Sequence, residues 1–117
     1  MTPRLKLLVL RCADLAKSRD FYTCIGLDLK PEQHGTGPLH YACEMDGFVL
    51  EIYPARSAGG NDADGMLGFE VVSLEAVLRR LAATGVLPKQ PPVMLPQGLR
   101  VLVPDPDGRT VELIQPN

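Results

Sequence analysis

The sequence has few aromatic residues and no excess of positive charge. Its 117 residues include no Trp, three Phe and three Tyr, and the formal net charge is −2. Proteins that bind single-stranded nucleic acid stack bases on aromatic side chains in a basic groove, and anionic membranes attract basic patches. The composition therefore predicts no nucleic-acid partner and no membrane partner, and it suits a neutral or cationic partner.

Cysteine is also scarce. The three residues, Cys12, Cys24 and Cys43, are odd in number and form no Cys-x-x-Cys pair. This pattern argues against a disulfide framework or a structural zinc site and indicates reduced thiols. Lys6 and Arg11 interrupt the first apolar run, which lacks the features of a signal peptide, and no stretch approaches the roughly 20 apolar residues that span a bilayer. We therefore expect a soluble, cytoplasmic protein.

The first half of the chain alternates short strands with one helix. Residues 5–12 form a Leu- and Val-rich run that predicts a strand. Asp14 can cap a helix that Gly26 ends. Residues 27–33 alternate apolar and polar side chains, which predicts a second strand that is half buried.

A hairpin and a linker follow. Residues 39–44 and 48–53 are strand-like runs on either side of Asp46 and Gly47, and an Asp-Gly pair in this position is a strong hairpin signal. Residues 55–66 are small, polar and rich in Gly, which predicts a flexible linker.

The same order of elements then starts again. Residues 67–72 predict a strand, and Ser73 caps a clearly amphipathic helix. Residues 86–93 contain three prolines, so that any strand there must lie at a sheet edge. Residues 98–103 and 109–115 predict a hairpin closed by an Asp-Pro-Asp-Gly turn.

The repeated order predicts an α+β domain of residues 1–117 with two βαβββ modules. Module 1 comprises residues 1–54, the linker 55–66 and module 2 residues 67–117. Antiparallel-rich sheets with helices on one side leave the other side free to curl around a ligand. We therefore expect a cupped mixed sheet that holds a small molecule.

Several stretches resemble one known family, and together with the order of elements they cover nearly the whole chain. The stretches are residues 12–22 with 25–27, residues 48–53 and residues 103–113. They resemble the vicinal oxygen chelate superfamily, which includes glyoxalase I, extradiol dioxygenases, fosfomycin-resistance enzymes and bleomycin-binding proteins. The resemblance implies the glyoxalase/bleomycin-resistance/dioxygenase fold, a small-molecule ligand and a homodimer whose cup can combine modules from two chains. It does not select one activity, because this fold hosts several chemistries.

The resemblance also implies four positions for metal ligands. They fall on Leu7, Glu51, Phe69 and Glu112, where the family has His or Gln at the first position and His at the third. Leu7 and Phe69 cannot donate to a metal, and two carboxylates alone make a poor site for a catalytic divalent ion. We therefore expect the metal site to be altered or absent, with Glu51 and Glu112 as the ligands of any divalent ion that does bind.

The predicted hairpin offers a second arrangement of polar groups. If it closes around Asp46-Gly47, Ala42 lies opposite Glu51, and His40 becomes a diagonal neighbour of Glu51 on the same face. His40, Glu51 and Glu112 are then candidate catalytic residues for proton transfer or metal binding. The alternatives are a satisfied strand histidine and carboxylates that face solvent or pair with an Arg.

Five further residues are candidates for lining the cup. Arg11 shares the strand face of Leu7 and can bind a carboxylate in a bidentate contact, or it can pair with one of the two glutamates. Tyr53 and Phe69 are the aromatic candidates. His34 lies in a Gly-rich loop at the expected rim, either as a surface residue or as part of a lid.

Two main hypotheses about function remain open, beside a third in which the chain is a degenerate family member with a structural or regulatory role. The first is a small-molecule enzyme of the glyoxalase or dioxygenase type, similar to lactoylglutathione lyase, with an altered or absent metal site. The second is a non-catalytic drug-binding protein of the bleomycin-resistance type. The retained carboxylates and Arg11 favour the enzyme, whereas the apolar residues at both imidazole positions favour the binding protein.

Overall fold

The computed structural model describes residues 2–57 and 64–117, so the centre of the predicted linker, residues 58–63, lies outside the described residues. The described chain forms eight strands and two helices. In chain order they are β1 (Leu7–Cys12), α1 (Leu15–Ile25), β2 (Lys30–Glu32), β3 (His40–Met45), β4 (Phe48–Pro54), β5 (Met66–Glu70), α2 (Leu74–Ala83), β6 (Val93–Leu95), β7 (Gly98–Pro104) and β8 (Thr110–Pro116).

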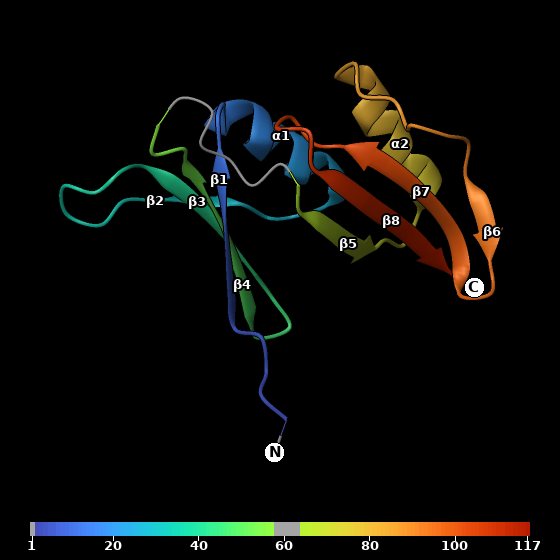
Figure 1. Ribbon diagram of the computed structural model, residues 1–117, viewed down its shortest axis with the longest axis horizontal. Coiled ribbons are helices and arrows are strands. Elements are labelled where there is room, and N and C mark those ends of the chain that lie inside the picture. The colour runs from blue at the N-terminus through green and yellow to red at the C-terminus, as the bar shows by residue number, and fades with distance from the viewer. Residues whose placement is uncertain (1, 58–63) are drawn as a thin grey trace.

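The strands form two four-stranded mixed sheets with the same topology. Sheet A has the order β1-β4-β3-β2 and sheet B the order β5-β8-β7-β6. In each sheet the first strand runs parallel to the fourth and the other neighbours are antiparallel. The prediction of two repeated βαβββ units in an α+β fold is therefore confirmed, and Figure 1 shows the two sheets side by side.

Both helices begin, and α1 ends, where the sequence predicts. The Asp14 side chain accepts a hydrogen bond from the Lys17 backbone N–H, and the Ser73 side chain accepts one from Ala76 N–H. Gly26 follows α1 with a φ of 123°, in the region that favours glycine. Capping fixes the start of each helix because it satisfies backbone donors that have no partner within the helix.

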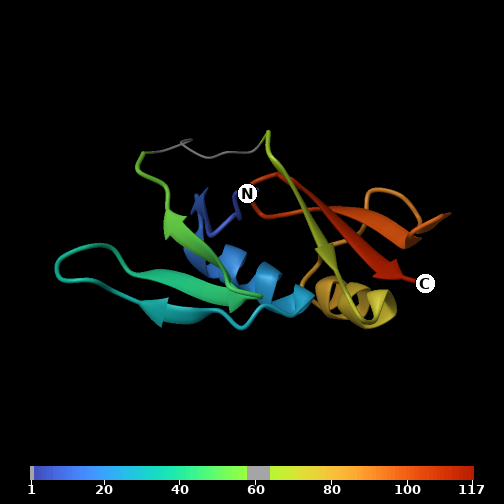
Figure 2. The ribbon, with the colours of Figure 1, turned by 90° about the horizontal axis from the view of Figure 1, so that it is seen from below.

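The core lies between the helices and one face of each sheet. Side chains alternate along a strand, so the buried residues of β1 and β4 point toward α1 while their neighbours point to the opposite, open face. α1 contacts β4, α2 contacts β8, and the two helices contact each other, as Figure 2 shows from below. The core contains Leu10, Cys12, Phe21, Tyr22, Ile25, Leu27, Cys43, Leu50, Ile52, Val71, Leu74, Val77, Leu81, Val101, Val103, Val111 and Leu113.

A buried polar cluster also joins the two modules. Tyr22 of α1 donates a hydrogen bond of 2.6 Å to Asp105 Oδ2, and Arg109 Nη1 donates one of 2.9 Å to the same oxygen. Arg109 Nη2 also donates to the backbone oxygen of Arg11, at 2.6 Å. We call Tyr22, Asp105 and Arg109 the junction cluster. It fixes the β7–β8 turn against the end of β1 and against α1.

Two strands are much shorter than predicted. β2 is limited to Lys30–Glu32, within the predicted strand 27–33, because Leu27 leaves the sheet to join the core. β6 covers only Val93–Leu95 and begins just after Pro91 and Pro92, so its ladder contains no proline, and it lies at the edge of sheet B as predicted. Among the described residues, no helix is long and apolar enough to cross a membrane.

Candidate functional site on the open face of sheet A

The open face of sheet A gathers most of the residues that the sequence singles out. In the parallel pairing of β1 with β4, Leu7 lies beside Val49 and Arg11 lies beside Tyr53. Glu51, between Val49 and Tyr53, shares this face because the flanking Leu50 and Ile52 are buried in the core. The face therefore carries apolar, aromatic and charged groups together.

The β3–β4 hairpin has the predicted register and brings His40 to Glu51. It closes around Asp46 and Gly47, both with positive φ, and Ala42 pairs with Glu51. His40 Nε2 lies 3.5 Å from Glu51 Oε2 and 3.2 Å from the Tyr53 hydroxyl. His40 is 1 % exposed, whereas the Glu51 side chain is 17 % exposed. The predicted His40–Glu51 contact is thus present in the structure.

Aromatic stacking orders this part of the face. The His40 and Tyr53 rings are stacked, with centroids 4.1 Å apart and an angle of 8° between their planes. The Arg11 guanidinium carbon lies 4.8 Å from the centroid of the Tyr53 ring. A cation at this distance from an aromatic face is attracted by the ring quadrupole. Tyr53 therefore positions both a cationic and an imidazole group.

Glu32 is a member of this site that the sequence analysis did not identify. It pairs with His40 across β2 and β3, and its Oε1 lies 3.2 Å from His40 Nε2 and 3.7 Å from His34 Nε2. His34, in the loop after β2, is 75 % exposed at its side chain. We call Glu32, His34, His40 and Glu51 the face cluster. The signal that could have located Glu32 is a hairpin pairing of residues 30–32 with 40–42 across the Gly-rich loop.

Glu112 lies on the other sheet. It stands beside Gly68, where an added Cβ would come within 3.4 Å of Glu112 Oε1. Arg100 Nη1 lies 3.5 Å from Glu112 Oε2, so this carboxylate has an Arg partner, as the sequence analysis allowed. Glu112 is not part of the metal-ligand group that the described residues form. Within one chain the structure joins His40 to Glu51 but does not join Glu112 to them.

Phe69 does not lie beside Glu112. It pairs with the buried Leu113, and its ring centroid is 6.2 Å from that of Tyr22 on α1. The strand position that faces Glu112 is instead Gly68. Phe69 therefore packs on the helix-covered face of β5. Within one chain it does not line the cup, as the sequence analysis had predicted it would.

The family's metal does not fit the residues at the four implied positions. Leu7 and Phe69 offer no ligand atoms, and Glu51 and Glu112 stand on separate sheets, near His40 and Arg100 respectively. A tetrahedral or octahedral ion normally needs three or more protein ligands within bonding distance. The implied site therefore lacks the donors to hold such an ion within one chain.

The described surface has hollows on the helix side and on sheet A. One hollow, of about 510 Å³, lies on the helix side and is lined by α1 residues, by the segment that follows α2 and by the β7–β8 turn. A second, about 430 Å³, lies between the end of α1, β5 and α2. The third, about 330 Å³, is lined in part by Lys30, Glu32, Ala42 and Val49 of sheet A. The third hollow lies next to the face cluster, because Glu32 contributes to its lining.

The Cys12 thiol is buried, which disfavours its reactive form. Burial raises the pKa of the Cys12 thiol, with a smaller lowering contribution from Ser18. A raised pKa reduces the thiolate fraction, which is the nucleophilic form. Cys12, Cys24 and Cys43 are all free cysteines, so the predicted lack of a disulfide framework agrees with the structure.

Comparison with known proteins identifies the family. The family model of the Glyoxalase/Bleomycin resistance protein/Dioxygenase superfamily matches residues 4–113. An antibiotic-binding protein from Streptomyces sp. CB03234 is 25 % identical, with 99 % of this chain and 98 % of that chain covered and a TM-score of 0.73. No curated protein matches the chain.

Two further solved structures are similar. A glyoxalase/bleomycin resistance protein from the same Streptomyces strain is 26 % identical, with 96 % of this chain and 100 % of that chain covered and a TM-score of 0.70. A glyoxalase-related enzyme from Fulvimarina pelagi is 24 % identical, with 97 % and 88 % covered and a TM-score of 0.73. At 24 % identity, the likeness to the Fulvimarina pelagi protein shows a shared fold alone.

Proposed function

The chain belongs to the Glyoxalase/Bleomycin resistance protein/Dioxygenase superfamily, and within it we propose that the protein binds a small molecule without catalysing its conversion. The observation that carries the proposal is that Leu7 offers no ligand atom where the resemblance implies His or Gln, and that Glu112 has an Arg partner, Arg100. Isomerisation of the glyoxalase type needs a metal that polarises the substrate and a carboxylate base. At the four positions that the resemblance implies, this chain keeps the two carboxylates but lacks the further donors that would hold the family's metal.

The open face of sheet A offers the features of a binding surface. Small-molecule sites combine apolar and aromatic walls with a few placed polar groups. Here Arg11 and Tyr53 form a stacked pair and Glu51 supplies a mostly buried carboxylate. A hollow of about 330 Å³ on the same sheet is lined in part by Glu32, Ala42 and Val49. The antibiotic-binding protein that resembles this chain over 99 % of its length supports a small organic molecule as the ligand.

A second copy of the chain is proposed to complete the cup. Strands β1 and β5 are each the outer strand of a sheet, and the exposed side chains of Leu7 and Met66 lie on them. Apolar side chains at an unpaired strand edge favour association with another chain. The proposed homodimer, in the reducing cytoplasm that suits three free cysteines, would sediment as a dimer in analytical ultracentrifugation.

Calorimetric titration with metal-free bleomycin tests the binding function. We expect saturable binding by the wild type and weaker binding by Glu51→Gln, because the variant removes the anionic group that a cationic drug would contact. The matched control is Glu75→Gln, a fully separate surface position on α2. Absence of binding, together with turnover of the methylglyoxal–glutathione hemithioacetal, would contradict the proposal.

Arg11 is proposed to contact the carboxylate of an anionic ligand. Hydrogen bonds to charged groups contribute about 1.5–3 kcal/mol, so Arg11→Ala should weaken binding of a carboxylate-bearing probe such as glutathione by about tenfold or more. Arg19→Ala is the matched control, since Arg19 also stacks on a tyrosine, Tyr41, at 5.5 Å. Tyr41 lies among the residues packed against the core rather than on the open face. Equal affinities of the two variants would remove this role from Arg11.

One contact favours an enzyme as the second candidate. His40 Nε2 and Glu51 Oε2 are 3.5 Å apart in a half-buried setting, which suits a proton-transfer pair. The enzyme hypothesis predicts turnover of the hemithioacetal or of a catechol, lost in His40→Gln and in Glu51→Gln. Turnover that survives both substitutions would exclude this pair as its catalyst.

A further inference from the structure

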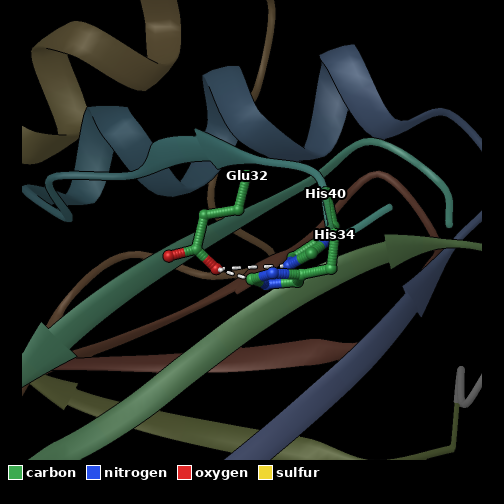
Figure 3. A group of neighbouring side chains, drawn as sticks. All are labelled: Glu32, His34 and His40. Atoms are coloured by element: carbon green, nitrogen blue, oxygen red, sulfur yellow. Dashed lines mark hydrogen bonds and ion pairs between the residues drawn. The ribbon is translucent and has the colours of Figure 1, made fainter. Parts of the chain in front are cut away.

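The face cluster contains a group of possible metal ligands outside the positions that the family resemblance implies. Ligand atoms of Glu32, His34 and His40 all lie within 4.8 Å of one another. Figure 3 shows the three side chains converging, with the Glu32 carboxylate oxygen directed at both imidazoles. The backbone explains the convergence, because β2 pairs Glu32 with His40 and the loop between them returns His34 to the same place.

His40 is held in one orientation by its surroundings. Its Nδ1 lies 3.2 Å from the Pro38 carbonyl oxygen, and its ring is stacked on Tyr53. A carbonyl oxygen can only accept, so this contact places a proton on Nδ1 and leaves Nε2 to face the carboxylates. Metal-binding histidines commonly use the second ring nitrogen in this way, as a donor to a backbone carbonyl.

Two carboxylates lie close to His40 Nε2, and their negative charges favour a positive charge between them and the ring. Glu32 Oε1 lies 3.2 Å and Glu51 Oε2 3.5 Å from this one nitrogen. A neutral imidazole would turn its lone pair toward two carboxylate oxygens, which is unfavourable in a site where His40 is 1 % exposed. A bound cation would satisfy all three groups, and the Tyr53 hydroxyl, 3.2 Å from Nε2, would then move to another acceptor.

The distances match those of a first coordination shell. Zinc–nitrogen and zinc–oxygen bonds of about 2.0–2.1 Å in a tetrahedron place neighbouring ligand atoms about 3.3 Å apart. The two His–Glu32 separations are 3.2 and 3.7 Å, and Glu51 lies 3.5 Å from His40 as a further oxygen. Two imidazoles with carboxylate oxygens suit zinc and its first-row neighbours, whereas calcium and magnesium prefer oxygen alone.

We propose that Glu32, His34 and His40, with Glu51 beside them, bind one divalent transition-metal ion of the zinc class at the rim of the open face of sheet A. The proposal goes beyond the binding function above and does not depend on it. The ion would lie next to Arg11 and Tyr53, where it could contact an anionic group of a bound ligand. It would use one carboxylate, Glu51, from the positions that the family resemblance implies.

Zinc titration of purified, chelator-treated full-length protein tests the site. We expect one zinc ion per chain by calorimetry, an increase in thermal midpoint with zinc, and no comparable effect of calcium. Removing a residue that only hydrogen-bonds to a metal ligand typically weakens metal affinity about 10- to 100-fold. Losing a direct ligand, in His34→Ala or Glu32→Gln, should therefore weaken zinc affinity at least tenfold. Both side chains are exposed, so the variants should fold normally.

Controls separate this site from the alternatives. Glu75→Gln, with its side chain on the surface of α2, should bind zinc as the wild type does. Circular dichroism of each variant confirms that folding is retained. The proposal is overturned if the wild type binds no zinc, or if His34→Ala and Glu32→Gln bind as tightly as the wild type. Loss of binding in Glu51→Gln and Glu112→Gln, with His34→Ala unaffected, would also overturn it, because the ion would then occupy the family's position.

Discussion

The junction cluster and the face cluster contain similar charged groups in different surroundings. In the junction cluster each oxygen of Asp105 accepts two hydrogen bonds: Oδ1 from the backbone N–H groups of Asp107 and Arg109, and Oδ2 from Tyr22 and Arg109. The Asp105 and Arg109 side chains are 0 % and 1 % exposed. This carboxylate is therefore fully satisfied and serves the structure.

In the face cluster the carboxylate acceptors outnumber the hydrogen-bond donors. Two carboxylates, Glu32 and Glu51, share a single imidazole nitrogen of His40, and both remain partly exposed to solvent. A buried carboxylate whose hydrogen bonds are all made indicates a group that stabilises the fold. Carboxylates on an open face with more hydrogen-bond acceptors than donors around them indicate a ligand site. This difference is the basis on which we propose that the junction cluster serves the fold and the face cluster serves a ligand.

Removal of the cation from the junction cluster should have the largest effect on stability. Arg109→Met leaves Asp105 buried without its charged partner, and breaking a buried ion pair in this way costs about 3–5 kcal/mol. Urea unfolding followed by circular dichroism measures the loss. Arg79→Met is the matched control, because its i,i+4 pair with Glu75 is exposed. A loss below about 1 kcal/mol in Arg109→Met would show that the junction cluster does not hold the modules together.

Removal of the tyrosine hydroxyl should have an intermediate effect. Tyr22→Phe deprives Asp105 Oδ2 of a hydrogen bond of 2.6 Å while it preserves the ring that packs against Phe21 and Phe69. A buried acceptor that loses a donor costs about 1–3 kcal/mol. The same urea measurement gives the value, and a variant as stable as the wild type would show that Arg109 and the backbone satisfy Asp105 alone.

The Tyr22 hydroxyl should also make the free energy of unfolding depend on pH, with a smaller effect. Burial, and then the hydrogen bond to Asp105, raise the pKa of Tyr22 above its ordinary value near 10. The folded state therefore keeps this proton while the unfolded chain loses it, so the stability is complete below about pH 10 and falls as the pH rises further. The fall due to one such group is about 1.4 kcal/mol per pH unit. Unfolding at pH 9, 10 and 11 should show the gap between wild type and Tyr22→Phe narrowing; a constant gap would contradict it.

Part of this account was predictable from local sequence signals. The caps at Asp14 and Ser73 defined the helices, and the turn at Asp46-Gly47 fixed a register that brought His40 to Glu51. These features depend on residues close in sequence. Period-two alternation then assigned Glu51 to the open face.

Other parts depended on contacts between distant residues. The hydrogen bond from Tyr22 to Asp105 spans 83 positions, so the Asp-Pro-Asp-Gly segment alone indicated only a turn. Phe69 lies in a run that is apolar at Met66, Leu67 and Phe69, where alternation does not decide which face is buried. Glu32 was missed because β2 has only three residues and all of them are exposed, so no apolar pattern defines its pairing.

The most direct test of the contrast between the two clusters is a pair of substitutions that each remove one negative charge and keep the shape of the side chain. Urea unfolding of Asp105→Asn and Glu51→Gln at pH 7 gives two free energies of unfolding to compare with the wild type. We expect Asp105→Asn to lose about 3 kcal/mol or more, as for other broken buried pairs, and Glu51→Gln to stay within about 0.5 kcal/mol. Equal losses in the two variants would contradict the assignment of one cluster to the fold and the other to a ligand.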